Sequence, residues 1–89
     1  MIKSVSITIQ GRVQGVSFRY YTLQQARLND IRGYVRNKPD GSVFIEAEGE
    51  EEKLELFIRW CHDGPRWAIV ENIEITEQKP GNFSGFTIR

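Results

Sequence analysis

The sequence SVSITIQGRVQGVSFR (residues 4–19) is predicted to form the first strand of the fold, the loop that follows it and the start of the first helix. In its first half Val5, Ile7 and Ile9 alternate with polar residues, which is the period-two pattern of a strand with one buried face. The pattern predicts a strand that ends near Gln10. A glycine-containing loop follows, and a helical composition begins directly after it.

Two helices are predicted. The composition from Phe18 to about Asn29 suits the first, although its apolar residues spread over a wide arc. The second, from Glu50 to His62, has an apolar stripe at i, i+3, i+4 and i+7. The stripe consists of Leu54, Phe57, Ile58 and Cys61. Glutamates at its start suit the positive end of a helix, and Gly64-Pro65 ends it.

The remaining strands complete the order of elements. Residues 34–47 indicate a hairpin that turns at residues 38–41, where Pro and Gly occupy turn positions. The apolar alternation from residue 68 to 75 changes parity, which predicts a strand with a bulge or bend near Glu71-Asn72. Phe86 and Ile88 predict a short closing strand.

This order is β-α-β-β-α-β with an extra C-terminal strand. It predicts an α+β protein of the ferredoxin-like, two-layer sandwich type, in which two helices cover one face of an antiparallel sheet. At 89 residues the chain is expected to form a single domain, residues 1–89.

Composition argues against several classes of protein. Twelve Lys and Arg balance twelve Asp and Glu, so the charge typical of a protein that coats nucleic acid is missing. Any anion site must therefore be local. No apolar stretch is long enough for a signal peptide or a membrane span, and the single Cys61 cannot form an internal disulfide. We expect a soluble, cytoplasmic chain with neither nucleic acid nor membrane as a partner.

The loop of residues 11–17 is the first candidate for chemistry. It joins a strand to a helix, and glycines at 11 and 15 let its N–H groups turn inward, as in anion sites at helix N-termini. Arg19 can add a bidentate cation. Taken singly, two glycines four residues apart more often indicate only a tight turn, and a lone arginine is usually a solvated surface charge. The Gly-Lys-Ser/Thr ending of a nucleotide-binding P-loop is missing.

Topology places Asn37 near this loop. The first and second strands of a β-α-β unit run parallel, so the loop after the first strand and the end of the second share one edge. With the third strand between them, the backbones at Arg19 and Asn37 should lie roughly 9–10 Å apart. A phosphate and an arginine side chain can bridge that gap.

Motifs along nearly the whole chain resemble the acylphosphatase family. Gly-x-Val-x-Gly-Val-x-Phe-Arg at 11–19 is similar to the family's phosphate loop, and residues 33–37 (GYVRN) resemble its second motif. Gly64-Pro65, with Ala68 and Val70, resembles the third. The resemblance implies a hydrolase that cleaves acyl phosphates into a carboxylate and inorganic phosphate. Tyr34 stands where the family often has Trp, and we expect it to be buried.

The resemblance also implies residue roles. Arg19 would bind the substrate phosphate, and Asn37 would orient the attacking water. Backbone amides would complete the phosphate site together with Arg19, namely those of Gln14, Gly15, Val16, Ser17 and Phe18. No metal and no cofactor is expected, and inorganic phosphate is expected as product and competitive inhibitor. The expected form is a monomer.

Two binding functions remain alternatives on this fold. RNA recognition needs stacking aromatic residues on the central strands, whereas residues 4–10 have none and residues 42–49 have only Phe44. The closer alternative is a non-catalytic phosphate- or carbamoyl-phosphate-binding module, because the domain also resembles part of larger hydrogenase-maturation proteins. The sequence leaves this second alternative open.

Overall fold

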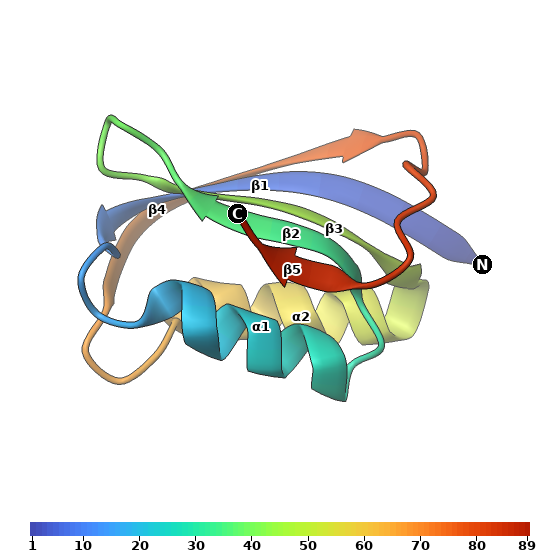
Figure 1. The fold of residues 1–89 in the computed structure, drawn as a ribbon, viewed down its shortest axis with the longest axis horizontal. Coiled ribbons are helices and arrows are strands. Elements are labelled where there is room, and N and C mark those ends of the chain that lie inside the picture. Colours follow the sequence, from blue (N-terminus) through green and yellow to red (C-terminus); the bar gives the residue numbers. More distant parts are fainter.

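The computed structural model describes residues 1–89, which form five strands and two helices in two layers. One layer is the sheet, and both helices pack against the same face of it (Figure 1). The elements in chain order are β1 (Ile2–Arg12), α1 (Phe18–Leu28), β2 (Arg32–Asn37), β3 (Val43–Glu50), α2 (Glu51–Asp63), β4 (Ile69–Gln78) and β5 (Phe86–Ile88). Neither helix is long and apolar enough to cross a membrane.

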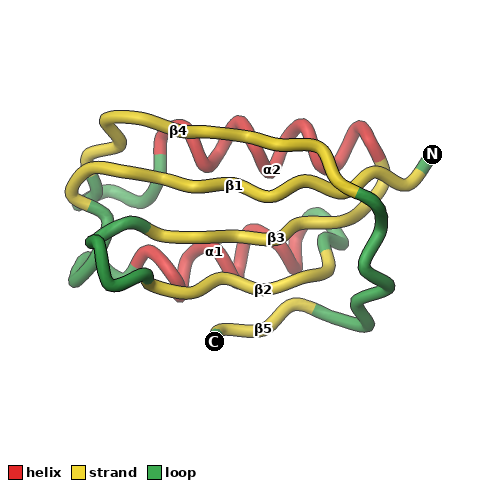
Figure 2. The backbone as a smooth tube through the Cα atoms, turned by 90° about the horizontal axis from the view of Figure 1, so that it is seen from above, coloured by secondary structure: helices red, strands yellow, loops and turns green.

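The strands lie in the order β4-β1-β3-β2-β5 (Figure 2). Because β3 lies between β1 and β2, the predicted ferredoxin-like α+β arrangement is confirmed. The terminal strand differs from its neighbours, since β5 pairs parallel to β2 while every other pairing is antiparallel. The sheet is therefore mixed, and not wholly antiparallel as expected.

A bulge shapes the end of β1. Gln10 pairs with Asn72 and Gly11 pairs with Val70, so Glu71 is the extra residue on β4, and the predicted bulge is confirmed. The strand continues past its predicted end near Gln10 because Gly11 fits against this bulge. Its φ is 132°, and an added Cβ would lie 2.1 Å from the carbonyl oxygen of Ile69.

The core lies between the sheet and the two helices. Alternate residues of β1 and β3 meet the stripe predicted for the second helix, with Leu54, Phe57 and Cys61 all buried. Phe57 also packs edge-to-face against Phe86 of β5, with ring centroids 6.1 Å apart. Burial raises the pKa of the Cys61 thiol, so this cysteine packs as an apolar residue.

Aromatic rings and cations cover part of the sheet's other face. The ring of Tyr34 lies 6.1 Å from that of Phe44 and 6.0 Å from that of Phe83. The guanidinium of Arg89 lies 4.0 Å above Tyr34, and that of Arg36 lies 5.4 Å from the Phe44 ring. Tyr34 is therefore only half-buried, contrary to the expectation that it is buried, because no further layer covers this face.

The segment between β4 and β5 crosses from one edge of the sheet to the other (Figure 2). Glu48 of β3 holds this segment, because its buried carboxylate accepts a hydrogen bond of 2.6 Å from the N–H of Gly81. The guanidinium of Arg32 lies 3.6 Å from the same carboxylate. This anchor holds the segment that leads into β5, which pairs with β2 from Gly33 to Val35 and runs parallel to it, toward the end at which Asn37 lies.

Candidate active site

The loop between β1 and α1 is held by its apolar side chains. Val13 and Phe18 are buried in the core, and Val16 packs against it. Between these anchors the backbone takes left-handed conformations at Gly15 (φ 74°) and Ser17 (φ 63°). Alternating anchors and left-handed turns leave the polar backbone groups of the loop free to face solvent or a ligand.

Backbone N–H groups are the main feature of this loop. From residue 14 to residue 19, none of them donates a hydrogen bond to a backbone carbonyl or to a side chain. The first turn of a helix always leaves such donors free, and here the loop adds further ones just before it. The first turn of α1 contains no acidic residue that could compete for them. The N-terminus of α1 therefore offers consecutive donors to an anion.

A cavity of about 480 Å³ opens at this loop. Its lining includes Gly15, Ser17, Arg19 and Asn37, so the structure brings these four predicted site residues together. Arg19 is exposed and makes no ion pair with a carboxylate, which leaves its guanidinium available to a ligand.

Gln14, Val16 and Phe18 are absent from this lining. Val16 and Phe18 direct their side chains to the core. These three residues can therefore contact a bound phosphate only through their backbone N–H groups, which is the form in which they were predicted to act.

Asn37 lies at the last position of β2 and is one of the residues that line the cavity. Its Oδ1 atom is buried and accepts no hydrogen bond from the protein. A buried amide oxygen without a partner is costly unless a ligand or a water supplies the missing donor. The last torsion of an asparagine is soft, so a modest rotation can present this oxygen to the cavity.

The side chain of Gln14 has a role that sequence reasoning missed. Its Nε2 donates to the carbonyl oxygens of Lys38 at 2.8 Å and of Ser42 at 2.9 Å. It therefore ties the loop to the β2–β3 hairpin directly after Asn37. Both acceptors are backbone atoms, which carry no residue-specific signal, so the sequence could not indicate this contact.

The hairpin that receives this contact has its own internal bonds. Asp40 Oδ1 accepts hydrogen bonds from the Ser42 hydroxyl at 2.6 Å and from the Ser42 N–H at 2.9 Å. The Ser42 hydroxyl is the main reason that the pKa of Asp40 lies below its ordinary value. The N–H of Lys38 also donates to the Ser42 carbonyl at 2.9 Å. These internal bonds, together with the contact from Gln14, hold the turn after Asn37 in place.

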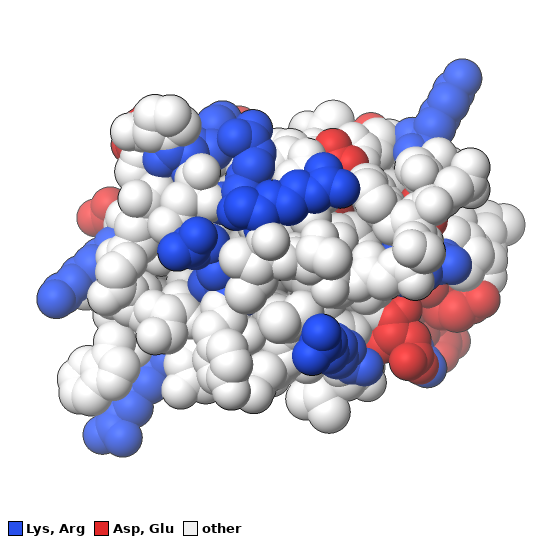
Figure 3. Space-filling model, in the orientation of Figure 1, with Lys and Arg blue, Asp and Glu red and all other residues white.

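Charge is unevenly distributed although the chain is neutral. Figure 3 shows several Lys and Arg side chains of this face toward the end that carries the β1–α1 loop, others across its middle and far end, and a group of Asp and Glu at the end opposite the loop, near the start of α2. The expectation that any anion site must be local is consistent with this separation.

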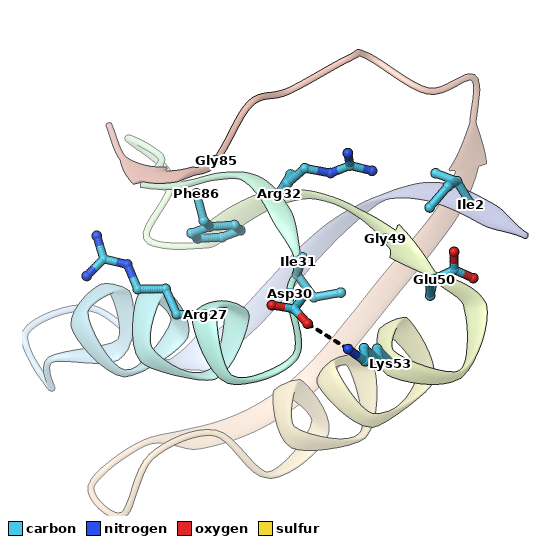
Figure 4. A pocket seen from close by; sticks show the side chains of 10 residues that line it. All are labelled: Ile2, Arg27, Asp30, Ile31, Arg32, Gly49, Glu50, Lys53, Gly85 and Phe86. Carbon is cyan, nitrogen blue, oxygen red and sulfur yellow. Dashed lines mark hydrogen bonds and ion pairs between the residues drawn. The ribbon is translucent and has the colours of Figure 1, made fainter.

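A larger cavity, of about 640 Å³, lies elsewhere. Its lining comes from the start of β1, the end of α1 and the start of α2, which is the end of the molecule opposite the loop (Figure 4). There Lys53 Nζ lies 2.6 Å from Asp30 Oδ2, which lowers the pKa of Asp30 and raises that of Lys53. The lining also includes Arg27, but Asp30, Glu50 and the paired Lys53 make this cavity less suited to an anion than the loop. No group of three or more His, Cys, Asp and Glu side chains is arranged to hold a metal ion anywhere in the chain.

Comparisons with known proteins identify related chains. The family model described as Acylphosphatase matches residues 5–88. An acylphosphatase of Nocardioides sp. is 44% identical over 89 residues, a match that covers 100% of this chain and 90% of the relative.

Solved structures give the same result. The crystal structure of acylphosphatase from Bacillus subtilis superposes with a TM-score of 0.95 and 36% identity, covering 100% of this chain and 99% of that one. The crystal structure of HypF from T. kodakarensis matches with a TM-score of 0.86 and 36% identity over 98% of this chain, but only 12% of the HypF chain is covered. The same domain structure therefore also occurs within a much larger protein.

Proposed function

This chain belongs to the acylphosphatase family, and on that premise we propose that it hydrolyses acyl phosphates at the cavity between the β1–α1 loop and the end of β2. The observation that carries this proposal is the convergence on one cavity of free backbone N–H groups, the unpaired Arg19 and the partnerless amide oxygen of Asn37. Residues 1–89 would act as one domain.

The phosphoryl group of the substrate binds to the loop. The N–H groups of residues 14–18 donate hydrogen bonds to its oxygens, and the Arg19 guanidinium adds two parallel, charged hydrogen bonds. Phosphoryl transfer passes through a loose transition state whose charge spreads over the equatorial oxygens. Fixed donors around those oxygens therefore stabilise the transition state without rearranging during the reaction.

The leaving group needs little assistance. Cleavage of the P–O bond of a carboxylic-phosphoric anhydride releases a carboxylate, whose conjugate acid has a pKa of about 4. It can depart unprotonated at neutral pH, so no general acid is required. This explains why a site made of amides, one arginine and one asparagine suffices for this class of substrate.

Asn37 orients the attacking water. An amide does not take up a proton, so this residue cannot be a general base, but its Oδ1 can accept a hydrogen bond from a water held in line with the phosphorus. The buried, unsatisfied state of this oxygen supports the assignment. The proton of the water passes to the phosphoryl group itself, whose oxygens are the nearest bases in this mechanism.

Further properties follow from the same site. Inorganic phosphate keeps the oxygens that the loop binds, so the product should compete with the substrate. We also propose a monomer in the cytoplasm. The long edge strand β4 supports the monomer, because Glu71, Glu74 and Glu77 would repel a second copy that paired along it.

A binding module without turnover is the second candidate, favoured by the match to a small part of HypF. In that case the loop would bind phosphate or carbamoyl phosphate as part of a larger assembly. The partnerless oxygen of Asn37 fits hydrolysis, in which the attacking water supplies its missing donor.

The test is hydrolysis of benzoyl phosphate at neutral pH, with and without a metal chelator. Arg19→Ala should reduce kcat/KM by about 100- to 1,000-fold, the loss typical of one transition-state donor. Arg19→Lys should recover only part of this loss, because the ammonium of lysine lacks the planar pair of N–H groups with which a guanidinium donates two parallel hydrogen bonds. Asn37→Ala should mainly lower kcat.

Two matched variants serve as controls. Arg27→Ala removes another exposed arginine of α1, and Asn72→Ala removes an exposed asparagine of β4; neither lines this cavity. Both should retain full activity. An inactive but folded wild type that still bound phosphate would favour the binding module. A higher KM with unchanged kcat in Asn37→Ala would contradict the water-positioning role, and loss of activity with chelator would contradict a metal-free mechanism.

A further inference from the structure

Two apolar side chains share the cavity with the proposed phosphate site. Tyr20 and Ile88 line it together with Arg19 and Asn37, and they are 52% and 43% exposed. Large apolar side chains with this exposure gain free energy when an apolar ligand covers them. The cavity therefore has a polar wall, made by the loop and Asn37, and an apolar wall.

The apolar wall is fixed in position. The Tyr20 hydroxyl accepts a hydrogen bond of 2.7 Å from Gln24 Nε2, one helical turn later, and its ring packs edge-to-face against Tyr21 with centroids 5.3 Å apart. Ile88 belongs to β5 and pairs with Val35 of β2, two residues before Asn37. The ring and the isoleucine thus come from a helix and a strand that are packed into the fold independently of the loop.

Substrate geometry sets what lies against this wall. In an acyl phosphate a single bridging oxygen joins the phosphorus to the acyl carbon, so the acyl group must lie beside the phosphate. When the phosphoryl oxygens point at the loop and Arg19, the bridging oxygen points away from them. The acyl group then occupies the part of the cavity bounded by Tyr20 and Ile88.

On this basis, and resting on the proposed function, we propose that Tyr20 and Ile88 form the acyl-group subsite, and that it selects acyl phosphates with aromatic or branched apolar acyl groups over small or polar ones. Each methylene of the acyl group that becomes buried increases the binding constant about fourfold. Because the wall is half-exposed, an aromatic ring gains only part of its full burial. We therefore expect each side chain to contribute about three- to tenfold.

The test compares benzoyl phosphate with acetyl phosphate. Tyr20→Gln keeps a good helix former and removes the ring, while Ile88→Thr keeps a β-branched residue in the strand and replaces a hydrocarbon arm by a hydroxyl. The readout is the ratio of kcat/KM for the two substrates, in which effects common to both substrates cancel. Each variant should lower this ratio about three- to tenfold through KM, because the smaller acetyl group covers less of the wall.

Matched controls exist for both variants. Leu28→Gln changes another apolar side chain of α1, 75% exposed, and Ile75→Thr changes an isoleucine of β4, 41% exposed; neither lines the cavity. Both should leave the ratio within about twofold. The inhibition constant of inorganic phosphate should stay unchanged in all four variants, which reports that the loop is intact.

The outcomes separate the two proposals. Turnover of acetyl phosphate by the wild type supports the proposed function whatever the ratio does. If the Tyr20 and Ile88 variants lose activity on both substrates in equal proportion, or if the two controls shift the ratio as much, the acyl subsite is wrong while the hydrolase stands. A wild type that turns over neither substrate overturns the proposed function and the subsite together.

Discussion

Replacing Gln14 by leucine should separate the two halves of the proposed active site without removing any group that binds phosphate. The variant loses the two hydrogen bonds from Nε2 to the carbonyl oxygens of Lys38 and Ser42. It keeps the backbone N–H of residue 14 and a side chain of similar size. The perturbation therefore acts on the contact between the loop and the hairpin that follows Asn37.

The size of the effect follows from the partners. A net hydrogen bond is worth about 0.5–1.5 kcal/mol, so two give about 1–3 kcal/mol. Both carbonyl oxygens keep another donor, because Gly41 N–H donates to Lys38 at 3.1 Å and Lys38 N–H donates to Ser42 at 2.9 Å. No acceptor is orphaned, so about 1–2 kcal/mol is expected. For a domain of this size that corresponds to a Tm lower by roughly 4–16 °C.

Thermal unfolding and steady-state kinetics test this together. We expect a lower Tm, a lower kcat on benzoyl phosphate, and an unchanged inhibition constant for inorganic phosphate. Gln10→Leu is the control, because Gln10 is exposed and its side chain makes one surface hydrogen bond, from Asn72 at 3.0 Å. If Gln14→Leu matched the wild type in Tm and kcat, the tie between the loop and the hairpin would carry no function. A weaker phosphate affinity would show instead that the side chain supports the loop itself.

Three other predictions concern stability and reactivity. Gly11→Ala should lower the free energy of unfolding by at least about 1–3 kcal/mol in urea titrations, because its Cβ would meet the Ile69 carbonyl at a φ that only glycine adopts readily; wild-type stability would contradict the bulge geometry. Asp40, with its lowered pKa, stabilises the fold at pH above its ordinary value of about 3.9, and this contribution is lost as the pH falls through the lower folded value. Asp40→Asn should therefore show a smaller loss of stability between pH 5 and 2.5 than the wild type, and equal losses would count against the Ser42 contact. Cys61, buried and with a raised pKa, should react with a thiol reagent at pH 8 only after unfolding in urea, so rapid labelling of the native protein would contradict its burial.

The layers of the fold were predictable because their signals are periodic. Alternation at Val5, Ile7 and Ile9 fixed which face of β1 is buried, and the helical spacing from Leu54 to Cys61 fixed the inward face of α2. The change of parity on β4 located the bulge opposite Gly11. Each signal is carried by several side chains that must all meet one core, so tertiary contacts reinforced the local pattern.

The pairing of β5 was not predictable in the same way. Three residues carry too short a pattern to indicate direction, and the parallel pairing with β2 depends on a long segment anchored by Glu48 at the N–H of Gly81. For that reason Ile88 could not be connected to the site from the sequence. Tyr34 was misjudged for a related reason, since an aromatic residue next to a buried valine gives no sign that its own face of the sheet has no covering layer.

The candidate site itself arises where regular structure stops. An anion site in a neutral chain needs donors that the rest of the fold has not already used, and regular helices and strands use theirs. The left-handed residues Gly15 and Ser17 break the pairing just before α1, which leaves consecutive N–H groups at the positive end of a helix. Each side chain around them then has one role. Arg19 adds a positive charge, Asn37 holds the attacking water, and Gln14 holds the loop against the hairpin that follows Asn37. Substitutions of those side chains should therefore reduce turnover more than they reduce phosphate binding, with Arg19 the exception because its charge contributes to both.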